Sequence, residues 1–324
     1  MNRFATRAAL VCLSVATAAA VITGPASATP SSLPHDGTST PAATARLNPQ
    51  TLADLETSMR GEAFANASYT FYADQADREN LPATARLYRR TAAVELHEHF
   101  REEAELAGVV GSDAENLRDA IEGETYETKV MYPTFARQAA EDGDDDAAEL
   151  FTEIARDEAQ HLKRFRAALK VVETGRGRIP APPPVDAVEV PAGDPQVHSE
   201  RTLANLDTAM HGEALAHARY TLYAEHAAAE GHEDLARLFR GTAEIELREH
   251  FAGEAVLFGL VRSTRENLEK TIAGERYEAR EMYPTFARRA AAVGDAEAAR
   301  LFRHNASDEA RHARAFQRML DNPR

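Results

Sequence analysis

Asp157-Glu158-Ala159-Gln160-His161 is the stretch that decides the fold, and it returns as Asp308-Glu309-Ala310-Arg311-His312. In each copy a Glu and a His stand three residues apart, so on a helix they lie on the same side. Phe151 and Ile154 continue the same apolar stripe, at spacings of three and four. Burying an acid and an imidazole there is unfavourable unless a cation compensates them as ligands. Taken alone, Glu-x-x-His more often marks a solvated pair, so the prediction needs carboxylates from other helices.

The helical part of the chain is an internal repeat with a constant offset of 151 residues. Met131-Tyr132-Pro133-Thr134-Phe135-Ala136 returns unchanged from Met282 to Ala287, and Ser68-Tyr69-Thr70 returns as Arg219-Tyr220-Thr221. Prolines and glycines divide each copy into four helices. In the first copy we predict these helices over residues 50–79, 82–108, 113–141 and 144–171, with Ser112 and Glu115 as a capping box. Long helices with short joints predict an all-α fold of four-helix bundles, with room for one longer crossover.

The chain divides into five segments. Arg3 and Arg7 precede an apolar run, and Ala26-Ser27-Ala28 offers a cleavage site, which together are typical of a Sec-type signal peptide. We therefore expect a secreted or extracytoplasmic protein, cleaved near Ala28. The predicted segments are a signal peptide (1–28), a disordered lead-in (29–48), a first bundle (49–172), a semi-extended proline-rich linker that is not part of a core (173–198) and a second bundle (199–322).

Charge and cysteine content exclude several classes of function. The formal net charge is −15, so nucleic acid and anionic membranes are unfavourable partners, whereas cations are favourable ones. The only cysteine, Cys12, lies in the predicted signal peptide, so we expect a mature chain without disulfides, zinc ribbons or iron–sulfur centres. After the signal, no apolar run is long enough to predict a membrane span.

Acidic residues, joined by one histidine in each copy, interrupt the apolar stripe of every predicted helix at mid-height. In the first copy these are Glu62, Glu95, Glu98, Glu124, Glu127, Glu158 and His161; in the second they are Glu213, Glu246, Glu249, Glu275, Glu278, Glu309 and His312. The alternative is that these stripes face solvent, but the other faces are crowded with charged residues. Converging carboxylates would repel one another in a metal-free core. We therefore predict a dinuclear site in each bundle, holding iron or manganese rather than zinc, which takes fewer ligands.

The sequence resembles the ferritin-like diiron domain of rubrerythrins over nearly all of both helical regions. The resemblance rests on Gly61-Glu62, Gly123-Glu124-Thr125-Tyr126-Glu127, Met131-Tyr132-Pro133 and Glu158-Ala159-Gln160-His161, and on their counterparts in the second copy. It implies two tandem ferritin-like four-helix bundles. Each would bind two iron ions and reduce hydrogen peroxide, with dioxygen as the alternative oxidant. Glu127 would be the extra carboxylate typical of the family. The hydroxyl groups of Tyr69, Tyr132, Tyr220 and Tyr283 would steady the ligands, although a bundle tyrosine is as often plain core.

Two departures from the family pattern affect these expectations. The second helix of a rubrerythrin reads Glu-x-x-His, whereas this chain has Glu95-Leu96-His97-Glu98-His99 and, in the second copy, Glu246-Leu247-Arg248-Glu249-His250. We predict that Glu98 and Glu249 are the ligands and keep His99 and His250 as alternatives. The rubredoxin-like module with its four cysteines has no counterpart in this sequence, so we expect an external electron donor. Asn305 stands where the first copy has Ile154, which suggests that the two sites are not equivalent.

Three functions fit these patterns. The first is a secreted dinuclear-metal peroxidase, and the second is a non-catalytic iron or manganese storage protein. The third is a helical pair whose acidic stripes only fix helix register, which the full ligand set disfavours. We expect the two copies to pack as an intramolecular pseudo-dimer, since the linker is long enough to cross one bundle. Exchange of helices between the copies is left open by the sequence.

Overall fold

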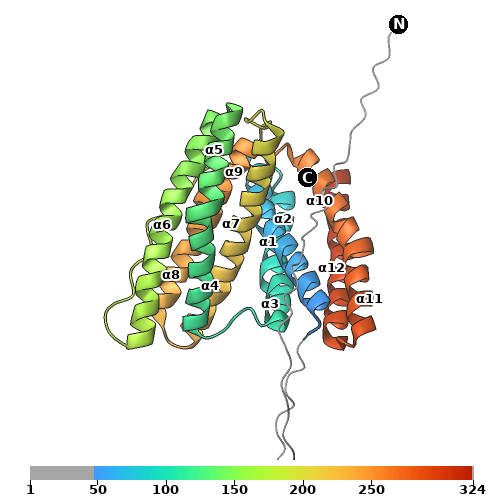
Figure 1. Cartoon of the computed structure of the whole chain (residues 1–324). Coiled ribbons are helices and arrows are strands. Elements are labelled where there is room, and N and C mark those ends of the chain that lie inside the picture. The colour runs from blue at the N-terminus through green and yellow to red at the C-terminus, as the bar shows by residue number, and fades with distance from the viewer. Residues whose placement is uncertain (1–46, 323–324) are drawn as a thin grey trace, which may run out of the picture. The chain divides into compact units, whose positions relative to one another are not determined.

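Two repeated sets of helices make up the computed structural model, which describes residues 47–322 (Figure 1). The predicted signal peptide, Cys12 and nearly all of the predicted lead-in lie outside the described residues. Within residues 47–322 the regular structure is entirely helical, so the all-α prediction is confirmed. The elements of the first repeat are α1 (Pro49–Arg78), α2 (Pro82–Val94), η1 (Glu95–Phe100), α3 (Arg101–Ala107), α4 (Asp113–Tyr126), η2 (Glu127–Met131), α5 (Tyr132–Asp142) and α6 (Asp145–Thr174). Those of the second are α7 (Glu200–Ala229), α8 (Glu233–Ile245), η3 (Glu246–Phe251), α9 (Ala252–Phe258), α10 (Thr264–Tyr277), η4 (Glu278–Met282), α11 (Tyr283–Val293) and α12 (Ala296–Asp321).

Short π-helical segments, named η1 to η4, each join two α-helices into one continuous rod. Each repeat therefore contains four rods, at the boundaries that the sequence predicts to within a few residues. The predicted capping box at Ser112 and Glu115 is present, and Ser263 with Glu266 repeats it at the start of α10. Gly143 ends α5 at a φ of 80°, a backbone conformation that favours glycine.

The four-helix bundles combine rods from both repeats. Bundle A consists of α1–α3 and α10–α12, and bundle B consists of α4–α9; in Figure 1, α1–α3 lie between α4–α9 and α10–α12. For example, α12 packs against α2 and α3, while α6 packs against α9, and α1 contacts α7 between the bundles. The prediction that residues 49–172 and 199–322 each form their own bundle is therefore wrong. The exchange of helices that the sequence left open is what the structure shows.

The short joint between α3 and α4 explains this exchange. Within each bundle the rod α2–α3 runs parallel to α10–α11, and α4–α5 runs parallel to α8–α9 (Figure 1). To pack parallel to α2–α3 of its own repeat, the rod α4–α5 (113–142) would have to begin beside Pro82, at the other end of the rod α2–α3 (82–107), about 39 Å away at 1.5 Å per residue. The joint at residues 108–112 spans less than about 20 Å even when extended. The chain therefore continues into the neighbouring bundle.

The segment between α6 and α7 is extended, as predicted, but it is docked rather than free. The backbone N–H groups of Val188, Gly193 and Gln196 donate to carbonyl oxygens of the second repeat, at 2.8–3.0 Å. Val190 is 2 % exposed and belongs to the apolar core that also contains Val261. The prediction that this linker stays outside the core is wrong at Val190 and at Val197, which is 6 % exposed and packs in the core cluster that contains Phe151.

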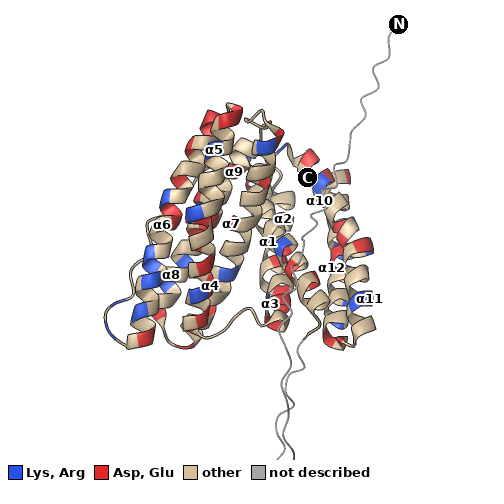
Figure 2. Ribbon diagram, in the orientation of Figure 1, with Lys and Arg blue, Asp and Glu red and all other residues tan. Residues whose placement is uncertain are grey.

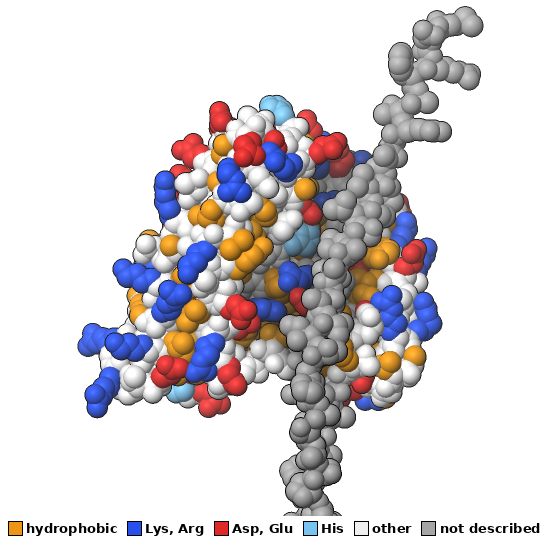
Figure 3. Space-filling model, viewed as in Figure 1, with side chains coloured by type: hydrophobic (Ala, Val, Ile, Leu, Met, Phe, Trp, Pro, Cys, Tyr) orange, Lys and Arg blue, Asp and Glu red, His pale blue; other side chains and the backbone are white. Residues whose placement is uncertain are grey.

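The outer surface carries both positive and negative charges. On the face seen in Figure 2 and Figure 3, Lys and Arg side chains are interspersed with Asp and Glu. Among the described residues, no helix is both long and apolar enough to cross a membrane.

Candidate metal centres

Each bundle contains one group of mostly buried carboxylates and imidazoles at mid-height, drawn from both repeats. Cluster A, in bundle A, consists of Glu62, Glu95, His99, Glu275, Glu278, Glu309 and His312. Cluster B, in bundle B, consists of Glu124, Glu127, Glu158, His161, Glu213, Glu246 and His250. Glu62 thus lies in a different cluster from Glu124, Glu158 and His161, because the rods are exchanged.

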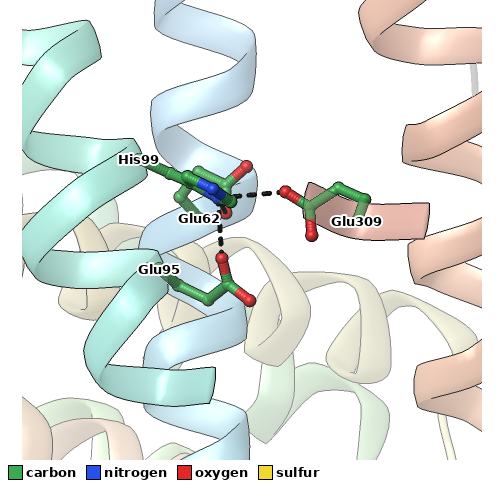
Figure 4. A group of neighbouring side chains, drawn as sticks. All are labelled: Glu62, Glu95, His99 and Glu309. Carbon is green, nitrogen blue, oxygen red and sulfur yellow. Dashed lines mark ion pairs between the residues drawn. The ribbon is translucent and has the colours of Figure 1, made fainter. Parts of the chain in front are cut away.

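Two glutamates in cluster A each face both histidines. Glu95 presents Oε2 to His99 Nδ1 at 2.9 Å and Oε1 to His312 Nδ1 at 3.2 Å. Glu309 presents Oε1 to His99 Nδ1 at 3.0 Å and Oε2 to His312 Nδ1 at 2.9 Å. Glu62 lies on the His99 side, as Figure 4 shows, and Glu275 on the His312 side. The cluster is therefore two overlapping groups of four donors that share Glu95 and Glu309, which suits a pair of metal ions.

Cluster B repeats this arrangement. Glu158 presents its two oxygens to His161 and His250, each at 2.9 Å from Nδ1. Glu246 does the same, at 3.2 Å from His161 and 2.8 Å from His250. Glu213 completes the His250 side and Glu124 the His161 side. The two imidazole rings lie 5.7 Å apart, against 5.9 Å for the pair in cluster A.

The second-helix residue that points into each cluster is the histidine, not the glutamate that the sequence analysis favoured. Glu98 is exposed, and Glu249 accepts a hydrogen bond from the backbone N–H of Asp186 in the linker. His99 and His250 are 1 % and 2 % exposed and point into their clusters. The prediction that Glu98 and Glu249 join the sites is therefore wrong.

Local helix geometry explains this error. Each of the four π-helical segments begins at a cluster glutamate, namely Glu95, Glu127, Glu246 or Glu278. Hydrogen bonding from i to i+5 widens the helical turn, so residue i+4 comes to lie above residue i. His99 is therefore placed over Glu95, whereas an ordinary α-helix sets positions i+3 and i+4 on either side of it. No π-helical turn was anticipated from the sequence.

All four predicted tyrosines contact cluster carboxylates. Tyr69 donates to Glu275 Oε1 at 2.7 Å, and Tyr220 donates to Glu124 Oε1 at 2.8 Å. The hydroxyl groups of Tyr132 and Tyr283 lie in short contact with Glu213 Oε1 and Glu62 Oε1. Each of these contacts joins residues of different repeats, so the tyrosines fix the ligands and the helix exchange together.

Two buried glutamates next to the clusters were missed by the sequence analysis. Glu103 and Glu254 are both 0 % exposed, and each contacts the hydroxyl group of a cluster tyrosine, Tyr283 or Tyr132. They occupy equivalent positions at the offset of 151. This repetition, four residues beyond His99 and His250, is the signal that could have identified them.

The buried charges of the clusters require bound protons or bound cations to balance them. Burial, together with the charge of Glu158, raises the pKa of Glu213 to about 8, and burial raises that of Glu275 to about 8. Burial disfavours protonation of His161, but Glu246 and Glu158 outweigh it and raise its pKa to about 10. Carboxylates and imidazoles at this density need either bound protons or bound cations.

The donor atoms fit a metal pair better than a hydrogen-bonded network. Both ring nitrogens of His99 and of His250 lack a partner in hydrogen-bond geometry, although three carboxylate oxygens lie within 3.7 Å of each Nδ1. Both oxygens of Glu95 and of Glu246 also lack a hydrogen bond. Several oxygens and a nitrogen that approach a shared point without donating to one another are arranged as ligands are. Mixed carboxylate and imidazole donors suit iron or manganese.

A groove of about 450 Å³ leads from the surface towards cluster B. It opens between α4 and α7, and its lining includes Arg60, Arg219, Tyr220 and the cluster residue Glu127. At the equivalent place in bundle A, Phe64 stacks on His211 with ring centroids 4.0 Å apart. A small polar molecule therefore has an approach to cluster B past Glu127.

Comparisons with known proteins agree with this geometry. The rubrerythrin family model matches residues 93–169 and 204–320, more than half of the chain. The chain is 40% identical to rubrerythrin of Porphyromonas gingivalis over 128 residues, which cover 36% of this chain and 64% of that protein. It is 36% identical to nigerythrin of Nitratidesulfovibrio vulgaris over 137 residues, 38% of this chain and 67% of the relative. It is 35% identical to a putative rubrerythrin of Methanocaldococcus jannaschii over 148 residues, 39% of this chain and 72% of the relative. No solved structure matches the chain.

Proposed function

Because the chain belongs to the rubrerythrin family, we propose that clusters A and B each hold two iron ions and reduce hydrogen peroxide to water. One observation carries this proposal. In each cluster two groups of four donors share two glutamates, so each shared carboxylate can bridge a pair of ions. When bound, an iron pair supplies the two electrons that the reduction of one peroxide consumes.

The residues of the chain have distinct roles in this proposal. Glu95 and Glu309 bridge in cluster A, while Glu62 with His99 and Glu275 with His312 hold the two ends. Glu158 and Glu246 bridge in cluster B, between the pairs Glu124 with His161 and Glu213 with His250. Glu278 and Glu127 are the extra carboxylates. Burial of the bridging residues, each 1 % exposed, excludes bulk water from the centre.

Electrons come from a separate donor in this proposal. The sequence contains one cysteine, so a four-cysteine iron centre cannot form within one copy of it. Manganese is the alternative metal, and metal storage without turnover is the alternative function.

Iron content and peroxide titration test the proposal together. Purified protein reconstituted with ferrous iron under anaerobic conditions should hold about four iron ions per chain, two per cluster. After chemical reduction, each cluster should be oxidised by one equivalent of peroxide. The double variant Glu95→Gln/Glu246→Gln, which alters one bridge in each cluster, should lose most of the iron. Iron binding without oxidation by peroxide would contradict the peroxidase proposal and leave storage.

Export is a further part of the proposal, supported by the sequence pattern of residues 1–28. Mass spectrometry of the protein recovered from outside the cytoplasm should show a chain that begins at Thr29. A chain that retains residues 1–28 there, or stays in the cytoplasm, would contradict it.

A further inference from the structure

A groove of about 430 Å³ opens on bundle A, between the rod α10–η4 and the helix α12. Its two walls carry four exposed arginine side chains, namely Arg276 and Arg280 from α10–η4, and Arg314 and Arg318 from α12. The rest of its lining is Ala279, Ala310, Ala313 and Gln317. Among the described residues that line the groove, none is acidic. The groove therefore concentrates positive charge in a chain whose formal net charge is −15.

The four guanidinium groups have little to compensate them within the protein. Arg276 donates a hydrogen bond to Gln317 Oε1 at 2.9 Å, and none of the four makes an ion pair within residues 47–322. Like charges in one groove repel one another, so an anion bound between them is stabilised. Each guanidinium also offers N–H donors in a planar fork that matches the two oxygens of a carboxylate.

Bundle B has no equivalent of this groove at the corresponding positions. Two of the four arginines have uncharged counterparts at the offset of 151, namely Thr125 for Arg276 and Ala167 for Arg318. Leu162 stands where bundle A has Ala313, and it is buried, so a larger side chain fills the floor there. The groove beside cluster B also differs, because acidic residues accompany its arginines.

The arginines stand at two levels along the groove. The joint between α11 and α12 is only two residues long (294–295), so α12 runs antiparallel to α10–η4. Arg276 therefore lies at the level of Gln317, as their hydrogen bond shows, and Arg280 lies one turn along, near the level of Arg314. A small ion with one anionic group reaches one level. Two or more carboxylates on a short carbon chain reach both, while the chain itself contacts the alanines.

We propose that this groove binds a small polycarboxylate, held by arginines of both walls above Ala279, Ala310 and Ala313. The carboxylates accept charge-assisted hydrogen bonds from the guanidinium groups, and the apolar floor excludes water from the carbon chain. None of the lining residues belongs to cluster A. The site is therefore separate from the proposed metal centre, and binding there requires neither iron nor peroxide.

Isothermal titration calorimetry of the full chain with propane-1,2,3-tricarboxylate tests the proposal. The wild-type protein should bind one equivalent, with the same affinity before and after treatment with a chelator, and more weakly as sodium chloride is added. Arg280→Gln/Arg314→Gln should weaken binding roughly tenfold or more, because it removes charge-assisted hydrogen bonds from both walls. Arg265→Gln/Arg300→Gln is the matched control. It removes the same charge from exposed positions of α10 and α12 outside the groove and should bind as the wild type does.

A second variant separates the shape of the groove from its charge. Ala313→Leu, which copies bundle B, should weaken binding roughly tenfold or more by filling the floor, although the charge is unchanged. Absence of binding to the wild-type protein, or an equal loss of affinity in the groove variant and the control, would overturn the proposal. Equal affinity for inorganic phosphate at the same ionic strength would show that the groove recognises charge alone and would overturn the polycarboxylate assignment.

Discussion

Bundles A and B share their inner ligands but differ around them. Each of the seven residues in one cluster has its counterpart in the other at an offset of 151. Outside the ligands, Asn305 replaces Ile154, and the pair Phe64–His211 replaces Leu215 and Arg60. A substitution among the ligands leaves a buried charge without its partner, whereas a substitution around them only changes polarity or access. The shared clusters support the proposal that both bundles bind metal, and the differences lie in the polarity and the packing around them.

Removing one histidine from a cluster should have the largest effect. His99→Ala should lower the iron content from about four to about two ions per chain, because the ions of cluster A share both bridging glutamates. His250→Ala should do the same through cluster B. Elemental analysis of the reconstituted protein measures this. Glu98→Gln should keep full iron content, and a loss of iron in that variant would restore Glu98 as a ligand.

Most of the features that the two bundles share could be predicted from the sequence. The helix boundaries, the acidic ligands and the four tyrosines follow from periodicity, the internal repeat and the resemblance to rubrerythrins. These features depend on local spacing, which a single sequence displays. Glu62, for example, interrupts an apolar stripe and can be recognised as a buried acid without knowing which helices surround it.

The pairing of rods and the choice of His99 could not be predicted in the same way. The two repeats present equivalent faces, so a bundle within one repeat and a bundle between repeats satisfy the same pattern. The short joint at residues 108–112 decides between these two bundles. Its effect depends on the direction in which the following rod runs, and that direction is set by the packing of the whole bundle. The π-helical turn at Glu95 likewise has no local signal, because residues i+3 and i+4 both suit an α-helical ligand.

Removal of the metal should lower the stability of both bundles and show whether the two clusters contribute equally to it. A ligand that binds only the folded state stabilises it by about 2.7 kcal/mol for each site at a hundredfold excess over Kd. Chelation should therefore lower the melting temperature of the wild-type protein, and the fall should be about half as large in His99→Ala. Differential scanning calorimetry with and without chelator measures this. Equal falls in both proteins would mean that cluster A contributes no metal-dependent stability.

The tyrosines Tyr69 and Tyr220 should be energetically equivalent. Their hydrogen bonds to Glu275 and Glu124, at 2.7 and 2.8 Å, differ little in length or burial. Tyr69→Phe and Tyr220→Phe should each cost about 1–2 kcal/mol in urea unfolding of the metal-free protein, since each leaves a buried acceptor unpaired. A difference well beyond 1 kcal/mol between the two variants would show that the contacts between the repeats are unequal.

The smallest effect should come from the pair Asn66 and His217, which occupy equivalent positions. His217 Nδ1 lies 2.8 Å from the carbonyl oxygen of Ala243, and Asn66 Nδ2 donates to that of Ala92 at 2.7 Å. Burial lowers the pKa of His217, since the buried ring resists a charge.

The stability that neutral His217 contributes is therefore complete above the unfolded pKa of about 6.5 and is lost as the pH falls below it, because only the unfolded chain takes up the proton. Between pH 7.5 and 5.5 this loss should reach about 1 kcal/mol. His217→Asn, which copies the residue of bundle A, should reduce the pH dependence of unfolding by that amount, whereas Asn66→Gln should leave it unchanged. Identical pH dependence in the wild type and His217→Asn would show that His217 keeps its ordinary pKa in the folded protein.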